Sequence, residues 1–194
     1  MSNRKLPIVT IIILILNILG LVYEFKVGQT KALILYGMFQ GAIEDGEYLR
    51  VVVSAFLHIG VLHFGSNMIC LFVYGLTLER QIGSLKFAFV YVVSIIGSGV
   101  LINYLGGGSI HAGASGAIWG LMTASLVYNL NHYLNPALAL RGIITNLIYS
   151  FSANVSWQGH IGGGIAGLIA ALFVCGNNSD FIINAKKKEE GDSQ

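Results

Sequence analysis

The sequence predicts an all-α membrane protein in which six transmembrane helices form one bundle. Of the 194 residues, 55% are hydrophobic and only 10% are charged, and the mean hydropathy is +0.72. This balance is too apolar for a soluble globular domain. Because the apolar residues gather into long stretches, we expect a single polytopic membrane domain over 1–176 and a solvated, disordered tail over 177–194.

The first expected span, 7–23, is apolar and follows the basic residues Arg4 and Lys5. No small-residue cleavage site follows it, so we interpret it as a retained span and not as a signal peptide. Residues 24–60 mix charged side chains with short apolar clusters, a pattern typical of a connection that lies in the membrane interface.

The other spans are delimited by charged, glycine or proline residues. The second stretch stops before Glu79, the third stops at the three glycines of 106–108, and Pro136 prevents continuation of the fourth. The expected spans are 62–78, 87–105, 115–130, 138–151 and 159–175.

The basic residues predict the orientation of this bundle. With six spans, one side of the membrane receives Arg4, Lys5, Arg80, Lys86, Arg141 and Lys186 to Lys188. The other side receives only Lys26, Lys31 and Arg50. Because basic residues favour the cytoplasmic side, we expect both termini in the cytoplasm of a multi-pass protein of the cell membrane.

This orientation brings several polar residues to one depth. The second, fourth and sixth spans all enter from the outer side, and their first turns carry His63 with Asn67, then Ser115, then His160. His132 falls at the inner end of the fourth span and is too far away. The remaining histidines, His58 and His111, fall in outer loops and stay possible members of the same group.

Glycine spacing predicts how the fourth and sixth spans approach. Glycines recur at intervals of four on each span, as Gly116 with Gly120 and as Gly163 with Gly167. Such pairs form grooves that let helix backbones come close. If the grooves face each other, His160 lies beside Ser115, and Gly113 frees the backbone that enters the fourth span.

These residue types point to serine nucleophile chemistry. A serine hydroxyl needs a base to accept its proton, and histidine suits that role near neutral pH. The backbone N–H of Ser115, with His63 and Asn67, could bind an oxyanion. Every Asp and Glu lies in a loop, in a tail or at a span boundary, so we expect a Ser–His dyad without a carboxylate, and neither a metal nor a cofactor.

The same residues have structural interpretations. A serine among small residues commonly serves helix packing, and His63 with Asn67 could form hydrogen bonds between helices. Histidines inside membranes are rare and costly, which favours a functional role for His160. A transporter or channel is disfavoured because the polar groups gather near the outer ends of the spans. We expect no nucleic-acid partner.

Three motifs carry a resemblance to a known family. They are HFGSN at 63–67, GASG at 113–116, and GHIGG at 159–163 with its continuation to Gly167. With these motifs the chain resembles the rhomboid intramembrane serine proteases. The resemblance implies that Ser115 is the nucleophile and His160 the general base, and that His63, Asn67 and the Ser115 N–H form the oxyanion hole.

The resemblance also implies a fold and a substrate class. It implies a six-helix rhomboid-like bundle with a water-accessible cavity open to the outer side. Its substrates would be transmembrane or membrane-anchored proteins, cut near the outer membrane boundary through an acyl-enzyme. The alternative is a non-catalytic relative that binds membrane clients and guides their turnover, but such relatives usually lack the serine or the histidine.

One position departs from the family pattern, and another agrees with it. Its usual Trp-Arg pair in the first loop appears here as Leu49-Arg50, which removes an anchoring aromatic ring. Trp119 stands where many members have an aromatic ring that packs on the catalytic histidine, so we expect the same stacking here. The resemblance also implies a minimal bacterial member in the plasma membrane, without a seventh span or an appended domain.

Overall fold

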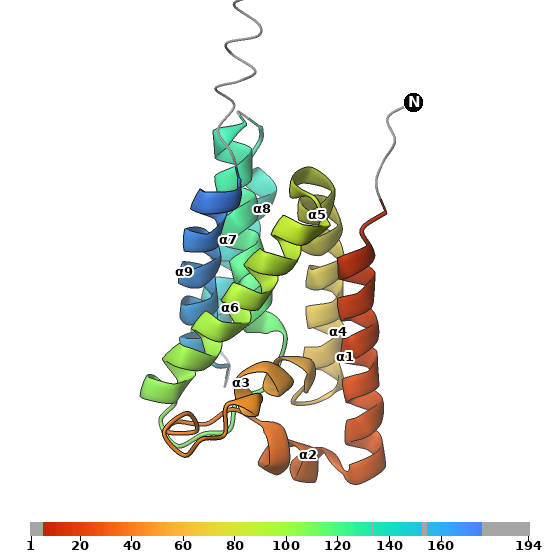
Figure 1. The fold of residues 1–194 in the computed structure, drawn as a ribbon, viewed down its shortest axis with the longest axis vertical. Coiled ribbons are helices and arrows are strands. Elements are labelled where there is room, and N and C mark those ends of the chain that lie inside the picture. Colours follow the sequence, from red (N-terminus) through yellow and green to blue (C-terminus); the bar gives the residue numbers. More distant parts are fainter. Residues whose placement is uncertain (1–5, 133, 153–154, 176–194) are drawn as a thin grey trace, which may run out of the picture.

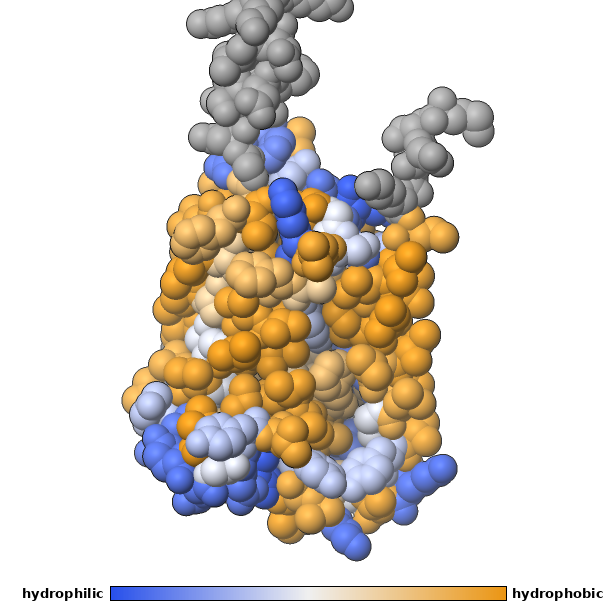
Figure 2. Space-filling view, viewed as in Figure 1, coloured by the Kyte–Doolittle hydropathy of each residue, from blue (hydrophilic) through white to orange (hydrophobic). Residues whose placement is uncertain are grey.

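The computed structural model describes residues 6–132, 134–152 and 155–175, and the regular structure of these ranges is helical (Figure 1). One isolated antiparallel bridge joins Met38 to His111. An apolar band covers the middle of the molecule, and polar residues gather at its two ends (Figure 2). The expected tail, 177–194, lies outside the described residues.

The helices follow the expected order of apolar stretches. They are α1 (Ile8–Val27), α2 (Gln29–Tyr36), α3 (Leu49–Val53), α4 (Val61–Cys70), α5 (Leu76–Ile82), α6 (Ser84–Leu105), α7 (Ser115–Asn131), α8 (Ala137–Ser152) and α9 (Trp157–Val174). A short 3₁₀ helix, Ser54–Phe56, follows α3, and a π-helical turn, Leu71–Gly75, joins α4 to α5. Helix α1 thus extends beyond the expected end at Tyr23 and takes up the start of the first loop.

Within the described residues, four helical segments are long and apolar enough to cross a membrane, so the chain is a multi-pass membrane protein. They are Ile8–Val27, Val61–Ile82, Ser84–Leu105 and Trp157–Val174. The expected fourth and fifth spans coincide with α7 and α8, which have 17 and 16 residues. Both are shorter than the ~20 residues that usually cross a bilayer core. The start of α1 and the end of α9 lie at the same end of the molecule (Figure 1).

Helices α6, α7 and α9 pack closely against one another and form the centre of the bundle. Their contact surfaces consist of small residues: a Cβ atom on Gly163 would overlap the backbone of Gly116, and one on Gly167 would overlap that of Gly120. The serines Ser94 and Ser98 of α6 lie against the same glycines of α7, because a Cβ atom on Gly120 or Gly116 would overlap them while also approaching the α9 backbone. The grooves of α7 and α9 therefore face each other.

Polar contacts hold the first loop against the bundle. Asn103 of α6 accepts a hydrogen bond from Ile43 N–H at 2.9 Å and donates one to Glu44 at 2.8 Å. Arg50 donates to the carbonyls of Ile34 and Gly37, both at 2.9 Å, and forms an ion pair with Glu47. Leu49 points outward, so Arg50 and Asn103 anchor a loop that lacks the aromatic ring.

At the opposite end, the carboxylate of Glu79 caps α1. It accepts hydrogen bonds from Val9 N–H at 2.9 Å, from Thr10 N–H and the Thr10 hydroxyl at 2.7 Å, and from the Ser84 hydroxyl at 2.7 Å. The first N–H groups of a helix have no partner within it, and an acidic group there also complements the helix dipole. Glu79 therefore ties the first helix to the α5–α6 turn.

Candidate active site

Ser115 is the first residue of α7, directly after a sharp bend at Gly113. Gly113 has φ = +134°, a conformation that favours glycine, and its N–H donates to Ser54 O at 2.9 Å. At the first position of a helix, the backbone N–H of Ser115 has no acceptor within the helix. Ser115, which is half-buried, therefore supplies both a hydroxyl group and this backbone N–H at the same place.

His63 and Asn67, one turn apart on α4, both lie against the bend that precedes Ser115. A Cβ atom on Gly113 would lie 2.7 Å from His63 Cε1, 3.1 Å from His63 Nε2 and 3.6 Å from Asn67 Nδ2. His63 Nδ1 accepts a long hydrogen bond of 3.4 Å from Ile59 N–H. The neutral ring then carries its proton on Nε2, the nitrogen nearer to the bend.

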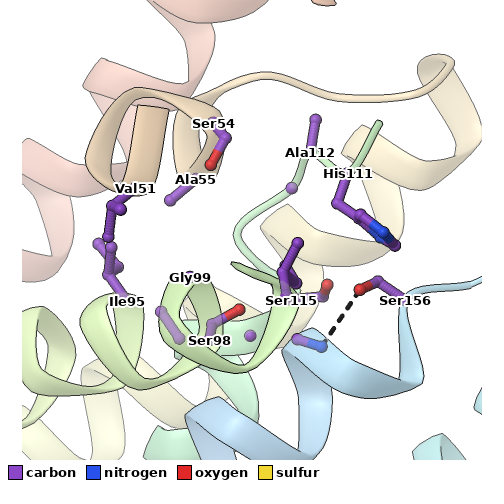
Figure 3. Close-up of a pocket in the computed structure, with 15 residues that line it drawn as sticks. Val51, Ser54, Ala55, Ile95, Ser98, Gly99, His111, Ala112, Ser115 and Ser156 are labelled. Carbon is purple, nitrogen blue, oxygen red and sulfur yellow. Dashed lines mark hydrogen bonds between the residues drawn. The ribbon is translucent and has the colours of Figure 1, made fainter. Parts of the chain in front are cut away.

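His160 is held from two sides in the first turn of α9. Its ring stacks on Trp119 of α7, with centroids 5.4 Å apart and an interplanar angle of 22°. This is the stacking expected from the sequence. Ser156 caps the helix, because its hydroxyl accepts the Gly159 N–H at 3.1 Å (Figure 3) and its carbonyl accepts the His160 N–H at 3.1 Å.

The expected site residues share one cavity. Ser115, His160, His63, Asn67 and Trp119 all line a cavity of about 370 Å³ between α4, α7 and α8. Asn67 Nδ2 is buried and has no hydrogen-bond acceptor among the described residues, so it is an available donor. The structure therefore brings together residues that the sequence placed on three different spans.

Ser115 also borders two further cavities. A larger one, of about 790 Å³, lies between residues 106–112 and 155–158 and also reaches His63. A small one of about 30 Å³, enough for one water molecule, is lined by the hydroxyls of Ser54, Ser98, Ser115 and Ser156 (Figure 3). No Asp or Glu of the described ranges lines any of the three cavities.

The other histidines lie in different surroundings. His111 lines the two cavities beside the first loop, and its Nε2 lies 3.0 Å from Gly106 O. His58 is fully buried behind His63, with their ring centroids 5.5 Å apart. Burial, followed by the proximity of His63, lowers the pKa of His58 to about 3, so its ring is neutral. His132 stacks on Tyr128 near the end of α7 that lies away from Ser115.

Three serines near Ser115 were not singled out from the sequence, although local signals for two of them exist. Ser156 precedes an apolar stretch and stands three residues before Gly159, which is the position of a helix N-cap. Ser98, with Ser94 four residues earlier, repeats the small-residue spacing of α7 and α9. Ser54 begins the short 3₁₀ helix after α3, where no periodic pattern in the sequence indicates its neighbours.

A helical membrane protein that gathers a serine, a histidine and hydrogen-bond donors in one internal cavity has the components of an intramembrane serine protease site. A model of the rhomboid domain matches residues 45–177. The chain therefore belongs to the rhomboid family.

Individual relatives agree with this assignment. The rhomboid protease GluP of Bacillus subtilis is 34% identical over 153 residues, which is 74% of this chain and 29% of that protein. The RHOMBOID-like protein 5 of Arabidopsis thaliana is 36% identical over 135 residues, 64% of this chain and 43% of that protein. The rhomboid protease AarA of Providencia stuartii is 28% identical over 200 residues, 84% of this chain and 71% of that protein. The chain spans less than half the length of the first two.

Proposed function

We propose that the protein is an intramembrane serine endopeptidase with a Ser115–His160 dyad. Its substrates are transmembrane or membrane-anchored proteins, which it cuts near the outer membrane boundary. The observation that carries the proposal is the shared cavity. It is lined by Ser115 at the start of a helix, by His160 stacked on Trp119, and by two hydrogen-bond donors, the His63 imidazole and the Asn67 amide. The relatives named as rhomboid proteases support the same chemistry.

In this mechanism His160 takes the hydroxyl proton of Ser115 while the oxygen forms a bond to the scissile carbonyl carbon. The C–N bond then breaks, and His160 returns the proton to the leaving amine. Water, with His160 again as base, hydrolyses the acyl-enzyme and restores the hydroxyl. Because no carboxylate from the described part of the chain lines the three cavities, we assign the orientation of the imidazole to the stack on Trp119 and to the first turn of α9.

The negative charge of the tetrahedral intermediate falls on the carbonyl oxygen. The Ser115 N–H, His63 Nε2–H and Asn67 Nδ2–H are the donors we assign to it, because all three lie at the Gly113 bend. Loss of one such donor typically lowers kcat by about a hundredfold. His63→Ala and Asn67→Ala should each have an effect of this size.

The proposal includes a six-span topology with both termini in the cytoplasm of a bacterial cell. Helices α7 and α8 would be the two remaining crossings. α7 is enclosed by α6 and α9, so protein and not lipid surrounds most of its length. In this orientation the first loop and the 790 Å³ cavity face the outer side, where a segment leaving the membrane could enter.

The test compares wild-type protein with Ser115→Ala in proteoliposomes that contain a model transmembrane substrate. Ser125→Ala is the matched control, because Ser125 is a buried serine on the same helix. We expect cleavage and labelling by a fluorophosphonate in wild type and control, and neither in Ser115→Ala. Cleavage that survives Ser115→Ala would falsify the assignment, and a wild type that binds the substrate without cleaving it would favour a non-catalytic role.

A further inference from the structure

We propose that Gln158 is a positioning residue for His160, an inference that rests on the proposed function. Its side chain ties the first turn of α9 to the end of α6, and this tie sets the place of the base relative to Ser115. Gln158 lies two residues before His160, and the family motifs in this sequence begin only at the next residue, Gly159.

The tie is a single, partly buried hydrogen bond. Gln158 Nε2 donates to the carbonyl oxygen of Leu105 at 2.8 Å, and Gln158 is only 9% exposed. Leu105 is the last residue of α6, so no N–H group of that helix donates to its carbonyl oxygen. Because Leu105 is 48% exposed and Gln158 also lines the 790 Å³ cavity, the bond is only partly shielded from water, and opening it costs about as much as losing an ordinary intramolecular hydrogen bond.

A second contact between α9 and α6 lies farther along these helices. Together with the Gln158 bond, it sets the orientation of the first turn of α9 relative to α6. Gly162 of α9 packs against α6 so closely that a Cβ atom there would lie 2.8 Å from Leu101 Cβ. This backbone contact and the Gln158–Leu105 bond lie on either side of His160 in the sequence. The Gln158 bond adds a directional polar attachment to the close packing of Gly159 and Gly162 against α6, and together these contacts fix the direction of the α9 start.

Stacking on Trp119 alone does not fix the position of the His160 ring relative to Ser115. Two parallel rings, 5.4 Å between centroids, can slide across each other with little loss of contact, so stacking fixes the plane of the imidazole better than its position. Ser156 stabilises the turn from within, because it accepts N–H groups of that turn. Of these contacts, only the Gln158 side chain forms a hydrogen bond that connects the backbone around His160 to another helix.

The test replaces Gln158 by methionine, which has a similar length but no donor. Displacement of a reacting group by about 1 Å can cost about a hundredfold in rate. We therefore expect Gln158→Met to lower kcat by about ten- to a hundredfold, to leave KM within about twofold, and to slow fluorophosphonate labelling of Ser115 by the same factor as kcat.

The matched control is Thr123→Val. It removes another hydrogen bond to α9, from the Thr123 hydroxyl to Gly164 O at 2.9 Å, at a point one turn beyond His160. It should lower the unfolding temperature about as much as Gln158→Met, but it should leave kcat and labelling close to wild type. If the Gln158–Leu105 bond had only a structural role, the two variants would have similar kcat values and labelling rates.

Two outcomes overturn the inference. One is a Gln158→Met protein with the kcat and labelling rate of Thr123→Val. The other is a raised KM with unchanged kcat, which would make Gln158 a substrate contact instead. A wild type without Ser115-dependent labelling would overturn the proposed function together with this inference, whereas an active wild type with equal variants overturns the inference only.

Discussion

The indole ring of Trp119 lies nearly parallel to the imidazole ring of His160, at 22° and 5.4 Å between centroids. Trp119 comes from α7, four residues after Ser115, and His160 comes from the first turn of α9. The residue that would be the nucleophile and the ring that supports the base therefore belong to one helix. Any movement of α7 carries both.

Trp119→Leu should reduce activity because the imidazole loses its stacking partner. Aromatic pairs contribute about 0.5–1.5 kcal/mol beyond area burial, which corresponds to a fall in kcat of about two- to tenfold. Trp119→Phe keeps a ring and should retain most of the activity. The measurement is kcat and KM on a model transmembrane substrate, and equal kcat for Leu and Phe would contradict a role for stacking.

Gly163→Ala should destabilise the bundle, because its Cβ would overlap the Gly116 backbone. Overpacking of a close contact costs about 1–3 kcal/mol. Gly164→Ala is the control on the same helix, since its nearest heavy atoms would be side-chain carbons of Trp119 and Thr123 at 3.6 and 3.7 Å. We expect a lower unfolding temperature in detergent for Gly163→Ala only; similar values for both would argue against a close α7–α9 contact.

Gly113→Ala should impair catalysis more than stability. The positive φ of Gly113 strains any other residue by about 1–3 kcal/mol, and its Cβ would push against His63. Gly108→Ala is the control, because Gly108 also has a positive φ, +78°, but nothing lies within 4 Å of its Cβ position. Both should lose similar stability, while only Gly113→Ala lowers kcat, by about a hundredfold.

His58 should make stability depend on pH. Its pKa falls from 6.5 to about 3 through burial and the proximity of His63, so between these values the unfolded chain binds more protons than the folded one. Stability therefore rises with pH across this window, by up to about 1.4 kcal/mol per pH unit, and is lost as pH falls from 6.5 towards 3. Unfolding temperatures measured from pH 4 to about 7 in detergent would show the slope.

Two variants separate this effect from general destabilisation. His58→Phe removes the titrating group and should flatten the slope. Phe64→Leu removes an aromatic partner of the His58 ring, at 5.1 Å between centroids, but leaves the histidine in place. Phe64→Leu should lower the unfolding temperature at every pH without changing its slope against pH. An unchanged slope in His58→Phe would assign the pH dependence to another group.

Much of the helical layout was predictable because its signals are local. Several helices end at glycines, and α7 begins at Ser115 as the fourth apolar stretch does. The expected end of the second span before Glu79 was wrong, because α5 continues through Glu79 and Arg80 to Ile82 and ends at Gly83. Counting alternate spans also put His63, Ser115 and His160 at one level, and in the structure they line one cavity. The anchoring of the first loop was less predictable, since Asn103 and Arg50 reach partners far away in the sequence or in irregular backbone.

Which helix faces meet was decided only by tertiary structure. In water, a hydrophobic stripe indicates the buried face of a helix, but in a membrane the lipid and the neighbouring helix are both apolar. The glycine pairs of α7 and α9 could therefore suggest a groove but not its occupant, and the spacing of Ser94 and Ser98 did not show that these serines lie against the same glycines. The Gly113 bend, the cap at Ser156 and the Gln158–Leu105 bond follow from how distant segments come together. Composition and spacing supply the chemical groups, and close contacts between glycine-rich helices place them within reach of one another.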